Sequence, residues 1–377
     1  RRVLFRSITF NLNAMNKKII YLCACAVAGL MLTISCQDSL ETDSSNSNTR
    51  SVLIDKNVFA VKGRINVKLT EAATRAIPAT RSGKIDMQSV PSPMLSAMNY
   101  AGAYRMERVF KPAGVYEART KAAGLDRWYT IYFDESKDVS AVIEHFNKVK
   151  GVEFAERILP ISQPKETSMP YEGSASGMQT RVGNSAFNDP LLSKQWHYYN
   201  DGTISPRAKK GADCNVLPVW EKYTTGKSNV IVAVVDGGID VTHEDLVDNL
   251  YVNEKEKNGQ PGVDDDGNGF VDDVNGYNFV EAKDVVGGTI EPDDEGHGTH
   301  VAGTVAARNN NGKGVSGIAG GDGSTGSGVH LMSCQIFRNK NEQGDAAAAI
   351  KYAADNGAVI CQNSWGYSSS SGVTEMP

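Results

Sequence analysis

Residues 230–235, Val-Ile-Val-Ala-Val-Val, form an uninterrupted apolar run that ends at Asp236-Gly237-Gly238. An apolar run of this length predicts a strand that is buried on both faces. Such strands occur mainly in parallel sheets that helices cover on both sides. This feature points to an α/β domain in which a carboxylate, Asp236, lies at the tip of a buried strand.

The segments further along the chain support this class. Residues 329–337 form a second apolar run, 345–356 are alanine-rich with helical spacing, and 358–363 predict a third strand. A strand, a helix and a strand in succession predict a parallel sheet, with ligands gathering at the carboxyl ends of its strands. Asp236 and Ser364 both fall at such ends.

Residues 55–161 predict a separate, small α+β domain. Residues 63–69 and 127–133 have the alternation or the β-branched and aromatic content of strands, and 151–158 predict another. Residues 140–149 have the apolar spacing of a helix. No cluster of catalytic residue types lies in this domain.

The N-terminus carries an export signal. Residues 1–14 fit no part of it and are interpreted as a non-native leader, whereas 15–36 have a basic start, an apolar run and a small residue before Cys36. This order resembles a bacterial lipoprotein signal and predicts an exported protein, either lipid-anchored at Cys36 in the cell envelope or extracellular. A plain secretory signal is the alternative. The apolar run is short for a membrane-spanning helix.

Two segments have the composition of disordered chain. Residues 37–54 form a polar, serine-rich tether, and 162–184 are rich in Ser, Gly, Pro and Thr. Neither holds enough apolar surface to order itself, so 162–184 predict an exposed linker that is open to proteolytic processing. The remaining chain, 185–377, contains the α/β domain.

Composition excludes several classes. The net charge is −5, with no basic face, which argues against a nucleic-acid partner. Outside the export signal, 15–36, only Cys214, Cys334 and Cys361 remain, an odd number without a Cys-x-x-Cys pair. The cysteines therefore indicate neither a disulfide scaffold nor a zinc site.

Two histidines, His297 and His300, lie among glycines in the stretch Glu-Gly-His-Gly-Thr-His-Val-Ala-Gly-Thr. A zinc-protease helix needs His-Glu-x-x-His, which this stretch lacks. A histidine becomes an effective general base when a buried carboxylate fixes its orientation. Asp236 at its strand tip is the carboxylate placed to do so.

Three stretches together resemble the subtilisin-like serine proteases. Residues 232–246 resemble the aspartate motif of that family, 296–304 its histidine motif, and 362–366 its substrate-binding strand, in family order. The resemblance covers roughly residues 188–377. Residues 55–161 resemble the family's propeptide in size and pattern.

The resemblance implies a subtilisin-like parallel sheet and polypeptide substrates. It assigns Asp236 as the orienting carboxylate and His297 as the general base, with His300 as a structural neighbour. Ser364, Trp365 and Gly366 would pair with an extended peptide through backbone hydrogen bonds. The N-terminal domain would act as an intramolecular inhibitor. No cofactor is implied for the chemistry.

One part of the family pattern is absent. The family's serine lies in a Gly-Thr-Ser-Met-Ala-like motif beyond the substrate strand, and no Gly-Thr-Ser occurs in these 377 residues. We therefore expect a truncated precursor that is inactive by itself. Two alternatives remain open, namely a non-catalytic peptide-binding protein and a calcium-stabilised surface protein.

Two structural calcium sites are predicted. Oxygen ligands in the acidic stretch 264–273 follow the early spacing of an EF-hand loop, although Asn275 stands where the last glutamate would be. A solvated acidic turn is the alternative. The predicted ligands of this first site are Asp264, Asp266, Asn268 and Asp272. The family resemblance implies a second site, formed by Gln195, Asp245 and Asn311.

Overall fold

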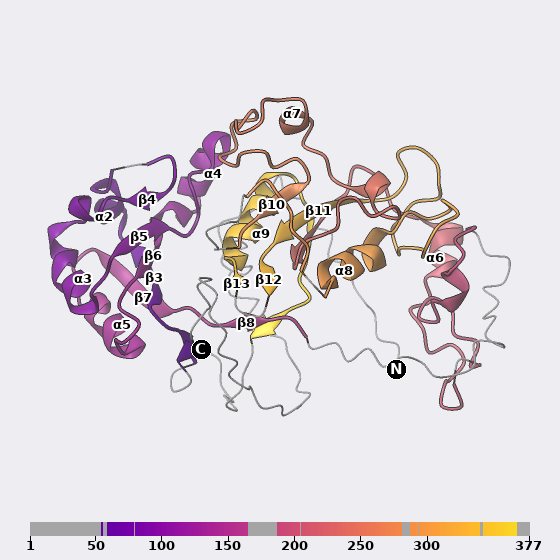
Figure 1. Cartoon of the computed structure of the whole chain (residues 1–377), viewed down its shortest axis with the longest axis horizontal. Helices are drawn as coiled ribbons and strands as arrows, with labels where there is room; N and C mark the ends of the chain where they lie inside the picture. Colours follow the sequence, from indigo (N-terminus) through magenta and orange to yellow (C-terminus); the bar gives the residue numbers. More distant parts are fainter. Residues whose placement is uncertain are drawn as a thin grey trace. The chain divides into compact units, whose positions relative to one another are not determined.

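The computed structural model describes residues 54–55, 59–78, 80–164, 187–203, 205–280, 287–293, 295–339 and 342–367. The predicted signal peptide, Cys36 and most of the predicted linker lie outside these residues. The chain divides into two compact units. One holds the described residues up to Ile161, and the other holds most of the described residues from Ser162 to Gly366. Figure 1 shows the helices and strands of both units.

The N-terminal unit is an antiparallel sheet with helices, as predicted. Its strands follow the order β4-β5-β6-β3-β7. Helix α5 begins after Asp138, whose carboxylate accepts the backbone N–H of Ala141 at 2.7 Å, and it buries Val142 and Phe146 in the core of this unit. The strands are β1 (Ile54–Asp55), β2 (Ala60–Val61), β3 (Arg64–Leu69), β4 (Lys84–Ile85), β5 (Arg105–Arg108), β6 (Trp128–Tyr132) and β7 (Val152–Arg157). The helices are α2 (Glu71–Arg75), α3 (Leu95–Ala101), α4 (Glu117–Ala122) and α5 (Val139–Asn147), with the short 3-10 turns η2 (Met87–Ser89), η3 (Ser92–Met94), η4 (Gly114–Tyr116) and η5 (Leu125–Arg127).

The second unit contains the parallel sheet that the apolar runs predict. Its order is β10-β11-β9-β14, and each neighbouring pair is parallel. The four strands are β9 (Ile231–Asp236), β10 (Gly276–Asn278), β11 (His330–Gln335) and β14 (Ile360–Gln362). In the register of β9 and β11, Asp236 lies opposite Gln335. Two buried polar side chains thus share the carboxyl edge of the sheet.

Two helices cover this sheet. Helix α8 (His297–Ala306) packs Ala302 and Ala306 against Val232 and Val234 of β9. Helix α9 (Ala346–Asp355) also contacts β9 and β11. Because successive residues of a strand point to opposite faces, and all of Val232 to Val235 are buried, both faces of β9 are covered. The α/β class is therefore confirmed.

The remaining elements of the chain are short. They are β8 (Ile161–Ser162), η6 (Leu192–Lys194), α6 (Leu217–Lys222), η7 (Val247–Asn249), α7 (Glu254–Lys257), β12 (Phe337–Asn339), β13 (Glu342–Gln343) and β15 (Gly366–Tyr367). Among the described residues, no helix is both long enough and apolar enough to span a membrane.

Candidate active site

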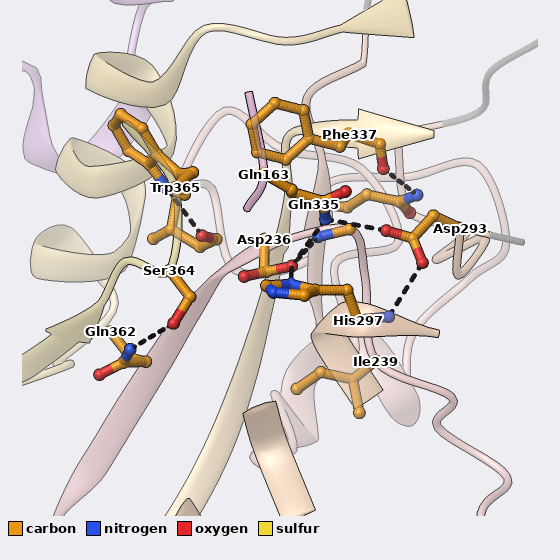
Figure 2. A network of polar contacts seen from close by, with 12 residues as sticks. Gln163, Asp236, Ile239, Asp293, His297, Gln335, Phe337, Gln362, Ser364 and Trp365 are labelled. Carbon is orange, nitrogen blue, oxygen red and sulfur yellow. Dashed lines mark hydrogen bonds and ion pairs between the residues drawn. The ribbon is translucent and has the colours of Figure 1, made fainter. Parts of the chain in front are cut away.

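The polar centre of the second unit is a buried pair, Asp236 and His297. Asp236 is the last residue of β9, and His297 is the first residue of α8. Nδ1 of His297 lies 2.7 Å from Oδ1 of Asp236, and the two side chains are 7% and 1% exposed (Figure 2). Since a carboxylate only accepts, the imidazole donates its Nδ1–H, and this fixes the tautomer in which Nε2 is the basic nitrogen.

Oδ1 of Asp236 accepts two further hydrogen bonds. The backbone N–H of Gly237 lies at 2.7 Å, and the side-chain amide of Gln163 donates from 2.9 Å. Oδ2 of Asp236 has no hydrogen-bond partner among the described residues. The three donors on Oδ1 offset the cost of burying this carboxylate and hold it in place beside the imidazole.

Helix α8 approaches the loop after β9 closely at its first turn. A Cβ atom on Gly298 would lie 2.3 Å from the carbonyl oxygen of Gly238, so only glycine fits there. The backbone N–H of Asp240 donates to Oγ1 of Thr299 at 2.9 Å. These two contacts explain why the residues between the two histidines are glycine and threonine, and they set the first turn of the helix against the strand that ends in Asp236.

His300 lies one turn further along α8 and is exposed. Its backbone N–H continues the helix by donating to the carbonyl of Gly296 at 3.0 Å. In the described part of the chain, neither His297 nor His300 belongs to a group of three side chains arranged to hold a metal ion. The two histidines therefore differ in their surroundings, one being paired with a carboxylate and the other facing solvent.

The predicted substrate strand follows β14, the neighbour of β9. Nε1 of Trp365 donates to the carbonyl of Val235 at 3.0 Å, which fixes the indole beside the strand of Asp236. Oγ of Ser364 accepts a hydrogen bond from Gln362 at 2.8 Å. Gly366 opens β15, and a Cβ atom there would meet no other atom within 4 Å. Figure 2 shows Ser364 and Trp365 on the side of Asp236 away from Asp293.

Comparison with known proteins identifies the family. The profile of the subtilase family matches residues 227–376, and the profile of the N-terminal region of that family matches residues 65–202. The chain belongs to the subtilase family. The N-terminal unit and the α/β unit of this subtilase therefore correspond to two regions that are characteristic of the family.

Two curated relatives agree with this assignment, and one solved structure is also similar. Subtilisin-like protease 1 of Plasmodium vivax is 37% identical over 207 residues, which are 54% of this chain and 28% of that protein. Kexin of Saccharomyces cerevisiae is 29% identical over 209 residues, 55% of this chain and 20% of that protein. The solved structure of fervidolysin from Fervidobacterium pennivorans, described as a keratinolytic enzyme related to subtilisin, aligns at a TM-score of 0.47 and 20% identity. That alignment covers 86% of this chain and 40% of that one. The matches thus span only 28% and 20% of the lengths of these two curated proteases.

The residues of the calcium site implied by the family resemblance meet at the loop of residues 309–316 of this subtilase. Asp245 accepts from the side-chain amide of Asn311 at 2.8 Å and from the backbone N–H of Val315 at 2.9 Å. Gln195 exchanges two hydrogen bonds of 2.8 Å with the backbone of Ser316. Burial raises the pKa of Asp245, although its hydrogen bonds to Val315 and Asn311 lower it in part.

A second buried carboxylate, Asp189, contacts the same loop, and no local sequence pattern indicated it. It accepts the backbone N–H groups of Asn310 and Asn311 and the hydroxyl of Ser316. Its negative charge also raises the pKa of Asp245. Carboxylate and amide oxygens are the ligands that Ca²⁺ prefers, and a cation here would relieve the burial of negative charge. The residues present therefore fit a calcium ion.

In the structure, the acidic stretch 264–273 contributes to a cluster of three carboxylates whose members differ from the predicted calcium ligands. Three carboxylate oxygens lie within 4.8 Å of one another, one each from Glu256, Asp266 and Asp273. Burial raises the pKa of Glu256, and the nearby Asp266 raises it further. Three clustered carboxylates fit a hard cation. Of the predicted aspartates, Asp266 belongs to this group, whereas the carboxylate of Asp272 accepts the backbone N–H of Gly262 at 2.9 Å.

The other two predicted ligands lie in the same stretch. Asp264 is half-buried and outside the group of three acidic residues, and Asn268 is fully buried. Glu256 is the member that the sequence did not indicate, because it lies ten residues before Asp266, in α7. Its carboxylate accepts the backbone N–H groups of Asp265, Asp266 and Asp272, and so holds the loop in its folded form.

Proposed function

We propose that this subtilase chain is part of the precursor of an exported serine endopeptidase, in which Asp236 and His297 are two members of an Asp-His-Ser triad. The buried 2.7 Å contact between the two side chains carries this proposal. In the proposed reaction, Nε2 of His297 takes the proton of a serine hydroxyl as the oxygen attacks a peptide carbonyl. The negative charge of Asp236 then stabilises the imidazolium that forms.

The nucleophile of this reaction is proposed to lie in a segment that the present sequence does not include. No Gly-Thr-Ser motif occurs in the 377 residues, and Ser364 accepts a hydrogen bond from Gln362 within the substrate strand. Accordingly, we expect the 377-residue chain to bind peptides along residues 364–366 without hydrolysing them. The same chain would be unable to process its own linker, 162–184.

The N-terminal unit is proposed to act as an intramolecular inhibitor until the linker is cut. The match of residues 65–202 to the N-terminal region of the family supports this role. The export signal, with lipid attachment at Cys36, is proposed from the sequence alone. Loss of labelled palmitate in a Cys36→Ala variant tests the lipid, and unchanged labelling would contradict it.

Calcium is proposed to have a structural role at two places. Asp245, Gln195 and Asn311 would hold one ion, and the group of Glu256, Asp266 and Asp273 would hold another. A bound cation would neutralise carboxylates that are partly or wholly removed from water, so its contribution would be to folding and to loop order. Neither ion takes part in the proposed proton transfers.

The proposal is tested by peptide hydrolysis with the protein encoded by the complete gene. We expect His297→Ala to remove hydrolysis and linker processing, whereas His300→Ala retains both. The second variant is a matched control, because the two histidines lie one turn apart on α8 and only His297 contacts a carboxylate in the described structure. Hydrolysis that survives His297→Ala would contradict the proposal.

A further inference from the structure

The segment that leads into α8 is anchored at several points to the tips of β9 and β11. The side-chain oxygen of Gln335 accepts the backbone N–H of Glu291 at 2.8 Å, and its amide nitrogen donates to the carbonyl of Glu291. Two residues later, the backbone N–H of Asp293 donates to the carbonyl of Gly237 at 2.8 Å. This segment therefore has a fixed position relative to Asp236.

The side chain of Asp293 caps the helix that begins at His297. Its Oδ1 accepts the backbone N–H of His297 at 3.1 Å, and its carbonyl accepts the N–H of Gly296 at 3.0 Å. Gly296, at the N-cap position, has a φ of 66° and no side chain that could satisfy this N–H. Asp293 thus supplies the missing cap, and it does so at the backbone of the residue that acts as the base.

The second oxygen of Asp293 connects it to the other member of the pair. Nε2 of Gln163 donates to Oδ2 of Asp293 and to Oδ1 of Asp236, each at 2.9 Å. Figure 2 shows the two carboxylates on either side of this amide, with His297 below them. A Cβ atom on Gly237 would lie 1.8 Å from Oδ2 of Asp293, so the carboxylate occupies the space of a missing side chain.

We propose that Asp293 is a positioning residue for His297. In the uncut chain, one carboxylate holds the backbone of the base, while the amide of Gln163, at the start of the proposed linker, ties that carboxylate to Asp236. The imidazole and its partner are thus located by one network. Asp293 is 8% exposed, so this network lies largely out of contact with water. This inference rests on the proposed function, because it assigns His297 as the base.

The test follows the hydrogen-bonded Nδ1–H of His297 by proton NMR in the 377-residue chain, so it requires no hydrolysis. The variants are Asp293→Asn, which keeps the size but removes the charge, and Gln163→Ala, which removes the shared donor and leaves the cap. Asp345→Ala is the matched control, because Asp345 caps α9 by accepting the N–H of Ala348 at 2.9 Å.

In Asp293→Asn we expect the Nδ1–H resonance to move and its exchange with water to accelerate by about tenfold or more. A factor of this size is expected when one charge-assisted hydrogen bond weakens. Gln163→Ala should give a smaller change in the same direction. Asp345→Ala should lower the thermal midpoint and leave the resonance in place. In the protein from the complete gene, Asp293→Asn should lower kcat with little change in KM.

Two results would overturn the proposal. One is a His297 resonance with unchanged frequency and exchange in both Asp293→Asn and Gln163→Ala, which would leave Asp293 as a helix cap only. The other is an equal change in Asp345→Ala, which would show that general destabilisation moves the resonance. If Asp293→Asn does not fold, Gln163→Ala decides the question, because Gln163 is outside the helix and half-buried. A failed peptidase assay with a changed NMR signal would refute the proposed function and leave the positioning role intact.

Discussion

Two buried tyrosines donate hydrogen bonds to residues near the proposed calcium sites, one to a carboxylate and one to a backbone carbonyl. The free energies of these two hydrogen bonds can be compared within one protein. The hydroxyl of Tyr352 donates to Oδ2 of Asp273 at 2.6 Å, and the hydroxyl of Tyr198 donates to the carbonyl of Ser316 at 2.9 Å. Both tyrosines are 1% exposed. Each acceptor residue keeps a second donor, so the two Tyr→Phe variants differ mainly in whether the acceptor carries a charge.

Hydrogen bonds to charged groups contribute about 1.5–3 kcal/mol to stability, and those to neutral groups about 0.5–1.5 kcal/mol. Burial raises the pKa of Tyr352 well above its ordinary value, so the hydroxyl remains a donor at neutral pH. We therefore expect Tyr352→Phe to reduce the free energy of unfolding by about 2 kcal/mol and Tyr198→Phe by about 1 kcal/mol.

Urea denaturation of both variants, followed by circular dichroism, measures this difference. At a slope of about 2–4 °C per kcal/mol for a domain of this size, Tyr352→Phe should also lower Tm by roughly 4–8 °C. A cost for Tyr198→Phe equal to or greater than that for Tyr352→Phe would refute the assignment of the Asp273 contact as a buried, charge-assisted bond.

Three further predictions concern the helix and the two calcium sites. Gly303→Ala in α8 should stabilise the protein by about 0.5–1 kcal/mol, since a Cβ atom there meets nothing, whereas Gly298→Ala should destabilise it through the clash with Gly238; thermal melts compare the two. Because burial raises the pKa of Asp245 above 3.8, its folded form binds a proton more tightly than its unfolded form. In calcium-free buffer, the contribution of Asp245 to stability should therefore fall as pH rises above 3.8. The difference between wild type and Asp245→Asn, or between wild type without and with saturating Ca²⁺, in urea titrations at successive pH values isolates that contribution. Chelation should lower Tm of the wild type more than that of Asp266→Asn, and equal shifts would exclude that residue as a ligand.

Local sequence patterns predicted the strands of the α/β unit well. The apolar runs before Asp236 and in 358–363 became β9 and β14, and the alanine-rich segment became α9, capped by Asp345. Strand β10, Gly276–Asn278, was not predicted, because three residues with one aromatic side chain have no recognisable period. Its place beside β11 depends on long-range pairing that no local pattern encodes.

The Asp236–His297 pair could be predicted because each residue lies in a recognisable motif at the end of a regular element. Its supporting residues could not be predicted in the same way. Gln163 and Asp236 are 73 positions apart, and their contact depends on the path of the chain. Asp293 carried one local signal, a carboxylate just before a helix, which is typical of a cap. Glu256 carried none, because it reaches its loop from a separate helix.

The measurement that tests the central claim most directly is the rate of peptide hydrolysis by the protein from the complete gene, comparing wild type with Asp236→Asn. An asparagine would keep the size of the side chain, but its amide could hold the imidazole in the wrong tautomer. In serine proteases with this triad, that change lowers kcat by about 10⁴-fold. We predict a loss of that order in a variant that remains folded at the assay temperature, as circular dichroism would show. Activity within a few-fold of wild type would contradict the assignment of Asp236 and His297 as the acid–base pair of this subtilase.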